Sequence, residues 1–264
     1  MLLIGERING MFKDIGEAVL NHDPDPIKYW ARHQYEAGAH YLDVNTGPTV
    51  LAKEQAAVME WMVKICNDTV PLPCCIDSTN PEAIEAGCAA NKHGKAMINS
   101  TNADQRKMDI YLPMALKYNT AIIGLTMNKR GVPKSAADRA ALAMEIVVNA
   151  DMHGFPMEDL YIDPLMLPAN VAQDHGVEVL EAIRQIKALA PGVKTTIGLS
   201  NASQRCTNRR LLNRTFLIMC MAVGLDSAIV DMDDEALTDT VAAANVLLNK
   251  DIYCDSFLKT FRQR

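Results

Sequence analysis

Short polar side chains recur along this chain wherever a short apolar segment ends. They are Glu6 and Asn9, Asp43 and Asn45, Asp77 and Ser78, Asn99 and Ser100, Thr126 and Asn128, Asp163, Ser200 and Asn201, and Asp231. Carboxylates accept hydrogen bonds, whereas carboxamides both donate and accept them. A site built from both suits a flat heterocycle with an amino-pyrimidinone edge. Paired carboxylates could also hold Mg²⁺, but their alternation with carboxamides favours the organic ligand.

The residue types that are missing from this set exclude several chemistries. It contains no histidine, so it does not match a Ser-His-Asp hydrolase. It contains no lysine, which a Schiff-base aldolase needs. The chain has seven cysteines and six histidines, without a C-x-x-C or an H-E-x-x-H motif. We therefore expect reduced cysteines and no metal site.

Position relative to the apolar segments separates expected ligand contacts from expected helix caps. Three residues stand just before a helical segment and are predicted to be N-caps: Asn80, Asn102 and Asp233. Four lie inside or at the end of an apolar segment and are predicted to contact the ligand: Asp77, Asn99, Asp163 and Asn201. In the segment that ends in Asn201, Gly198 leaves room for a flat ligand to approach the backbone.

The apolar segments alternate with amphipathic ones, the pattern of βα units. The predicted strands are Leu2–Ile8, Tyr41–Asn45, Pro73–Ser78, Ala96–Ser100, Thr120–Met127, Leu160–Pro164, Thr195–Asn201 and Ser227–Asp231. The predicted helices are Ile27–Ala37, Leu51–Asn67, a helix from Pro81, Ala103–Tyr118, Ala136–Met152 with Ser135 as its N-cap, Val177–Leu189, Arg210–Val223 and Glu235–Leu248. Met11–Pro26 is left as a connection.

This alternation predicts one (β/α)₈ barrel, a TIM barrel, over residues 1–264. In such a barrel the carboxyl ends of the strands meet at one mouth, which brings the polar residues together. A doubly wound open sheet is the alternative, but no G-x-G-x-x-G follows the first strand.

A net charge of −6 and the lack of a basic run argue against a nucleic-acid partner. Without a signal peptide or a membrane-spanning run, we expect a cytoplasmic protein.

Several motifs resemble a known family. IGERING at the start, LDVNTG at 42–47, CIDSTN at 75–80 and MINSTN at 97–102 resemble a pterin-binding barrel. YIDPLMLPANVAQDH at 161–175 and GLSNASQ at 198–204 are similar to the methyltransferases that move a methyl group between tetrahydrofolate and a corrinoid protein. The resemblance extends to YCDSF at 253–257.

The resemblance implies a homodimer, with (methyl)tetrahydrofolate bound in the mouth of each barrel. Residues implied to hydrogen-bond the pyrimidine edge of the pterin are Asp77, Asn99 and Asp163. Gly198 and Ser200 would lie against the ring, and Asn201 would reach N5. Gln204 and Arg209 would lie near the ring or the p-aminobenzoate tail, and Asp43 and Asn45 would support the site from behind.

A methyl group on a neutral amine is a poor electrophile, because the departing nitrogen would carry negative charge. A hydrogen bond or proton at that nitrogen stabilises the transition state. We expect Asn201 to donate that bond, with the proton coming from water.

The other reactant is the cobalt of cobalamin. The chain lacks the D-x-H-x-x-G signature of a cobalamin domain, since Asp151–Gly154 has the wrong glycine spacing. The corrinoid is therefore expected on a separate protein that docks transiently over the mouth. The sequence leaves the direction of transfer open. It also leaves open whether the Arg205, Arg209 and Arg210 cluster meets the folate tail or the partner.

Two alternatives remain. Dihydropteroate synthases resemble this chain at the Asp77, Asn99 and Asp163 motifs, but they need a basic residue on the seventh strand, which here ends in Ser200 and Asn201. A barrel that binds folate without turnover is the other alternative.

Overall fold

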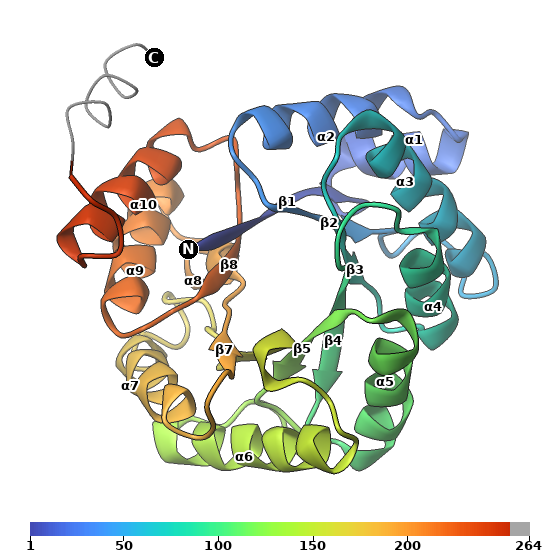
Figure 1. Ribbon diagram of the computed structural model, residues 1–264. Helices are drawn as coiled ribbons and strands as arrows, with labels where there is room; N and C mark the ends of the chain where they lie inside the picture. Colours follow the sequence, from blue (N-terminus) through green and yellow to red (C-terminus); the bar gives the residue numbers. More distant parts are fainter. Residues whose placement is uncertain (254–264) are drawn as a thin grey trace.

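Eight parallel strands form a ring in the computed structural model, which describes residues 1–253. They are β1 (Leu2–Asn9), β2 (Tyr41–Asn45), β3 (Cys74–Asp77), β4 (Met97–Asn102), β5 (Ala121–Leu125), β6 (Leu160–Asp163), β7 (Lys194–Thr195) and β8 (Ser227–Val230). Strands adjacent in the chain pair with one another, and β1 pairs with β8. Ile229 N–H donates to Ile197 O at 2.9 Å, which joins the last strand to the segment after β7. The ring is thereby closed, as Figure 1 shows in the view along its axis.

Helices surround the strand ring (Figure 1). They are α1 (Lys13–Asn21), α2 (Asp25–Glu36), α3 (Gln55–Thr69), α4 (Pro81–Ala90), α5 (Gln105–Tyr118), α6 (Ala136–Met152), α7 (His175–Lys187), α8 (Leu199–Ala202), α9 (Arg209–Ala222) and α10 (Glu235–Leu247), with a 3₁₀ turn at Met157–Asp159. This arrangement confirms the predicted (β/α)₈ barrel. None of the helices in residues 1–253 has the length and hydropathy to span a membrane.

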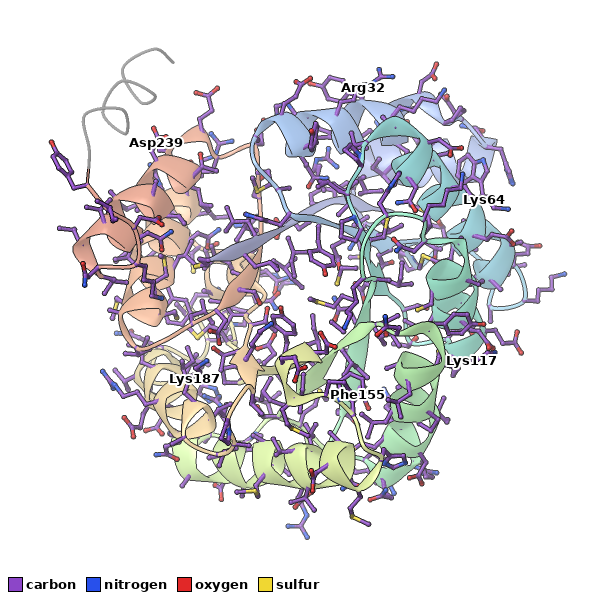
Figure 2. All side chains as sticks on the ribbon, viewed as in Figure 1. Arg32, Lys64, Lys117, Phe155, Lys187 and Asp239 are labelled. Atoms are coloured by element: carbon purple, nitrogen blue, oxygen red, sulfur yellow. The ribbon has the colours of Figure 1, made fainter. Side chains whose placement is uncertain are left out.

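The core has two parts, one between strands and helices and one inside the barrel. Figure 2 shows side chains filling the space inside the ring, while charged residues such as Lys64 and Lys117 lie on the outer surface. Cys74 packs in the outer part and Cys75 in the inner part, as expected for neighbours on one strand. The inner part also contains Ile4, Met97 and Tyr161. It closes the barrel below the mouth, so a ligand can enter only the upper layer.

The structure confirms two predicted helix caps and corrects two others. Ser135 Oγ accepts from Asp138 N–H, and Asn80 Oδ1 accepts from Glu82 N–H. The predictions for Asn102 and Asp233 were wrong. Asn102 ends β4, and Asp104 caps α5 instead. Asp233 binds Arg210, and α10 begins after Asp234. In both cases the chain needs one or two more residues to turn from the strand into the helix.

Met11–Pro26, predicted to be a connection, contains helix α1. This helix contains Gly16. The backbone of Gly16 packs so closely on the β1 loop that a Cβ there would lie 2.8 Å from Gly10 O. The glycine therefore permits a close helix–loop contact.

The predicted strand Thr195–Asn201 is also corrected. Regular pairing ends at Thr195, and residues 199–202 form the short helix α8. The neighbouring strand β6 has already ended at Asp163, and the last contact with β8 is the bridge between Gly198 and Ile229. Beyond it the backbone satisfies its hydrogen bonds within a turn, with Asn201 N–H donating to Gly198 O at 3.3 Å. Ser200 and Asn201 thus stand on a helical turn at the mouth. Of the YCDSF motif, residues 254–257 lie outside the described residues.

Candidate active site at the barrel mouth

Two amide–carboxylate pairs line the mouth at β2, β3 and β4. Asn45 Nδ2 donates to Asp77 Oδ2 at 2.7 Å, and Asn99 Nδ2 donates to Asp43 Oδ1 at 3.1 Å. Asn45 Oδ1 is itself occupied by Gly47 N–H at 2.7 Å. Asp77 and Asn99 are partners in the β3–β4 register, so they stand side by side. Each keeps one oxygen that these bonds do not use, the second carboxylate oxygen of Asp77 and the carbonyl of Asn99.

Burial sets the protonation of the two carboxyl groups. Asp43 lies two residues before Asn45 on β2, further from the mouth, and it is buried. Burial, followed by the nearby Asp77 carboxylate, raises the pKa of Asp43 well above its usual value. Burial also raises the pKa of Asp77, against the opposing bond from Asn45. The two carboxyl groups therefore ionise less readily together than a solvent-exposed pair would.

Asp163, the last residue of β6, connects three parts of the site. Its Oδ1 accepts Leu165 N–H at 2.7 Å, and Gly198 N–H also bonds to its carboxylate. Its backbone carbonyl accepts Thr126 Oγ–H at 3.2 Å, from the end of β5. Burial raises the pKa of Asp163 to about 6, although the two backbone N–H groups and Arg139 oppose this rise. The carboxylate is fixed in orientation where β5, β6 and the segment after β7 meet.

Helix α8 presents its polar residues to the mouth in different ways. Ser200 is half-buried, and its Oγ–H donates to Glu6 Oε1 at 2.7 Å. Asn201 is exposed. Its side chain folds back over Gly198, where a Cβ would lie 2.9 Å from Asn201 Nδ2. The space left by Gly198 is therefore the space that this carboxamide needs.

Arg209 and Gln204 follow α8 and are exposed. Arg209 Nη2 donates to Ser200 O at 3.3 Å, and its Nε donates to Ser203 Oγ at 3.2 Å. Arg210 instead pairs with Asp233 at 2.9 Å. Two members of the predicted arginine cluster thus have separate structural contacts, one to α8 and one to the loop after β8.

Glu6 lies at the mouth, as its strand-end position predicted, but it was not among the residues predicted to bind the ligand. The sequence showed it at a strand end, but a glutamate there has no distinguishing pattern. Its contact with α8 becomes visible only in the structure, where the Glu6 side chain reaches from β1 to Ser200. Within residues 1–253, no group of three His, Cys, Asp or Glu side chains is arranged to hold a metal ion.

Comparison with known proteins places this geometry in context. The model of the family "Pterin binding enzyme" matches residues 14–231. The methylcorrinoid:tetrahydrofolate methyltransferase of Eubacterium limosum is 29% identical over 265 residues, covering 100% of this chain and 97% of that protein. The methionine synthase of Mycobacterium tuberculosis is 29% identical over 243 residues, which are 87% of this chain but 20% of that protein. The resemblance seen in the motifs is thereby confirmed.

Among solved structures, a dihydropteroate synthase from Xanthomonas albilineans in complex with 7,8-dihydropteroate has a TM-score of 0.67 and 18% identity, covering 94% of this chain and 92% of that one. The same enzyme with 4-aminobenzoic acid gives a TM-score of 0.70 and 20% identity over 96% and 93% of the two chains. At such identities the likeness shows a shared barrel.

Proposed function

Because the chain belongs to the family of pterin-binding enzymes, we propose that it transfers a methyl group between N5 of tetrahydrofolate and the cobalt of a corrinoid protein. The full-length similarity to a methylcorrinoid:tetrahydrofolate methyltransferase supports this assignment. The observation that carries it is the placement of Asn201. Its carboxamide stands on a turn at the mouth, beside a carboxylate and carboxamide set that suits a pterin edge.

The pterin ring would be held by its pyrimidine edge. Asp77 and Asn99 offer adjacent oxygens whose directions are fixed by Asn45 and Asp43. Oxygens accept, so they suit the ring N–H and the exocyclic amine. Asp163 would bind the same edge from β6, two strands further around the ring from β4. Preorganised acceptors of this kind lose little freedom when the ligand binds.

Methyl transfer requires the N5–CH₃ bond to break as the cobalt–carbon bond forms. In the direction from folate, Co(I) supplies the electron pair of the new bond and becomes Co(III), while the old bonding pair stays on N5 and takes up a proton. Asn201 would donate a hydrogen bond to N5 as this charge develops, which lowers the barrier. The reverse reaction uses the same residues in the opposite order.

Gln204 and Arg209 are proposed to lie near the ring or the p-aminobenzoate tail of the folate. Both are exposed on the chain that leaves α8 toward α9. A guanidinium there suits a carboxylate on the tail. Arg209 already bonds α8, so this contact would add to a role in holding that turn.

The corrinoid protein is proposed to dock over the mouth. Exposed apolar side chains stand on the loops that follow β1, β2 and β6, with Met11 73%, Leu51 58% and Val171 76% exposed. Exposed apolar residues beside a polar site are typical of a surface that a partner covers. A homodimer would use another face, and the exposed apolar residues Met219 and Leu247 on α9 and α10 offer one.

The related activity of dihydropteroate synthase is less compatible with this chain. Lys194, the basic residue of β7, lies at the amino end of the strand, with its Nζ 3.3 Å from Tyr161 Oη. That end is opposite the mouth. The carboxyl end of the segment carries Ser200 and Asn201.

Replacement of Asn201 tests the proposal. We expect Asn201→Ala to lower the single-turnover rate of methyl transfer from 5-methyltetrahydrofolate to free cob(I)alamin by roughly 10²–10³-fold. Folate affinity should fall by less than about tenfold, the effect of one hydrogen bond. Asn149→Ala on α6 serves as the control. Wild-type protein without activity would overturn the function, and an unchanged rate in Asn201→Ala would overturn the role of Asn201.

A further inference from the structure

Strand β1 carries a bulge at the mouth. Gly5 pairs with Leu42 and Ile8 pairs with Val44, so three steps along β1 face two steps along β2. The extra residue falls at Glu6 and Arg7. Bulges interrupt the hydrogen-bond ladder and change the direction of a side chain, and they occur often beside active sites.

A buried glutamine from α2 supports this bulge. Gln34 is fully buried, and its Oε1 accepts Arg7 N–H at 3.0 Å, so it replaces a bond of the β1–β2 ladder. It packs so closely on β1 that a Cβ at Gly5 would lie 2.3 Å from Gln34 Oε1. The irregular backbone at Glu6 therefore has a dedicated partner on a neighbouring helix.

The bulge directs Glu6 across the mouth to α8, where its Oε1 lies 2.7 Å from Ser200 Oγ. Other charged groups near Glu6 come from all the elements around it: Asp231 after β8, Asp43 on β2, Arg209 at the start of α9 and Arg7 on β1 itself. Burial is the largest influence and raises the pKa of Glu6 to about 7, the bond from Ser200 opposes it, and Asp231 adds to it. Glu6 is therefore a carboxyl group that exchanges its proton near neutral pH.

We propose that Glu6 is a positioning residue that stores the proton exchanged with N5 of the folate and passes it through the Ser200 hydroxyl. The inference rests on the proposed function. When protonated, Glu6 can donate to Ser200 Oγ, and the hydroxyl hydrogen of Ser200 then points to the mouth. As the methyl group leaves N5, the bonding pair on N5 takes this hydrogen, Ser200 takes the Glu6 proton, and Glu6 becomes a carboxylate. Solvent restores the proton after product release.

The two directions of transfer must then have opposite pH dependences. Transfer from methyltetrahydrofolate needs protonated Glu6, so its rate falls as the pH rises through about 7. Transfer to tetrahydrofolate removes the N5 proton and needs ionised Glu6, so its rate rises over the same range.

The decisive experiment compares Glu6→Gln with wild type between pH 5.5 and 8.5, using 5-methyltetrahydrofolate with cob(I)alamin, and tetrahydrofolate with methylcobalamin. Glutamine keeps the shape but cannot exchange a proton. We expect the rate in its active pH range to fall by about 10²-fold in each direction. The ratio of wild-type to variant rate should vary with pH around 7, and by the same factor in both directions, because the two proteins share one equilibrium constant at each pH. Glu145→Gln on the outside of α6 should match wild type.

Two further measurements separate the outcomes. Ser200→Ala should lose the same pH dependence while Glu6 remains, because the relay is interrupted. The stability of Glu6→Gln relative to wild type, from urea unfolding, should increase as the pH rises from about 4.5 to about 7 and then level off, because over that range the unfolded wild type has lost the Glu6 proton while the folded protein still holds it. A wild type without methyl transfer would overturn the proposed function. An active wild type whose rate ratio to Glu6→Gln does not vary with pH would overturn the role of Glu6 alone.

Discussion

At the scale of single residues, polar side chains at the mouth have one atom hydrogen-bonded within the protein and another atom that these bonds do not use. Asn45 fixes Asp77, and Asp43 fixes Asn99. Asp163 is held by two backbone N–H groups. The supporting residue in each case decides which atom faces the mouth. A replacement behind the site should therefore alter ligand recognition without touching the ligand.

Gly198 offers a test at this scale. In Gly198→Ala the new methyl group would stand 2.9 Å from Asn201 Nδ2, a distance that forces the carboxamide away. The backbone itself can accept alanine, because φ at Gly198 is −79°. We expect methyl transfer to fall by about 10²-fold, close to the effect of removing Asn201, while the melting temperature changes little. Stopped-flow spectroscopy of cobalamin methylation provides the rate.

The matched control is Gly176→Ala in α7, where a Cβ would meet, among residues 1–253 and apart from its chain neighbours and its own helix backbone, only Met166 Cε at 3.9 Å. Alanine there should leave activity intact and stabilise the helix by up to about 1 kcal/mol. If Gly198→Ala retained full activity, the orientation of Asn201 over Gly198 would not matter for catalysis.

Several site residues could be predicted from the sequence, and others could not. Asp43, Asp77, Asn99 and Asp163 follow from the rule that polar residues at strand ends gather at the mouth. Glu6 obeys the same rule, but its importance arises from a contact between residues 194 positions apart. Such a contact depends on how the ring closes. A single sequence does not encode that distance in any local pattern.

At the scale of elements, the segment after β7 differs most from expectation. Its β-branched start predicted a strand up to Asn201, because the local pattern continues. Regular pairing stops early because β6 ends at Asp163, one residue beyond its pairing with Thr195, so the segment loses one of its two partners, which is a tertiary effect. The resulting helix α8 has only four residues, too few to be stable alone. It must be held by contacts such as Ala169 N–H to Ala202 O at 2.9 Å and those of Arg209.

Arg209 therefore has two possible roles, in holding α8 and in contacting the folate tail, and Arg209→Met distinguishes them. Loss of the bonds to Ser200 O and Ser203 Oγ should loosen the turn that carries Asn201. A hydrogen bond from a charged group contributes about 1.5–3 kcal/mol, so we expect kcat to fall by at least about tenfold. The effect should be equal for methyltetrahydrofolate and for a methyltetrahydropterin that lacks the tail.

Arg210→Met is the comparison, because Arg210 bonds Asp233 and not α8. It should leave kcat near the wild-type value. A rise in KM confined to the substrate with the tail, without a change in kcat, would show instead that Arg209 serves only as a tail contact.

At the scale of the whole molecule, the residues that stabilise the barrel lie apart from the residues of the candidate site. The apolar cores lie between strands and helices and inside the lower barrel. The upper end is polar, and the exposed apolar residues Met11, Leu51 and Val171 form a rim on loops that come from opposite parts of the ring. In the proposed reaction the cobalt comes within bonding distance of the methyl group, so the proposed partner would cover this end. The rim would then contribute to the partner interface and not to folding.

Met11→Glu tests this role of the rim, with Met152→Glu as its control. Both methionines are exposed, 73% and 78%, but Met11 follows β1 at the mouth and Met152 ends α6 at the opposite end of the barrel. A charge in the rim should weaken docking by about 1–3 kcal/mol, which raises KM for the corrinoid protein roughly tenfold. The rate with free cobalamin should not change, because no interface forms. If the two variants raised KM for the corrinoid protein equally, the docking surface would lie elsewhere. If Met11→Glu lost the reaction with free cobalamin, the loop after β1 would shape the active site itself.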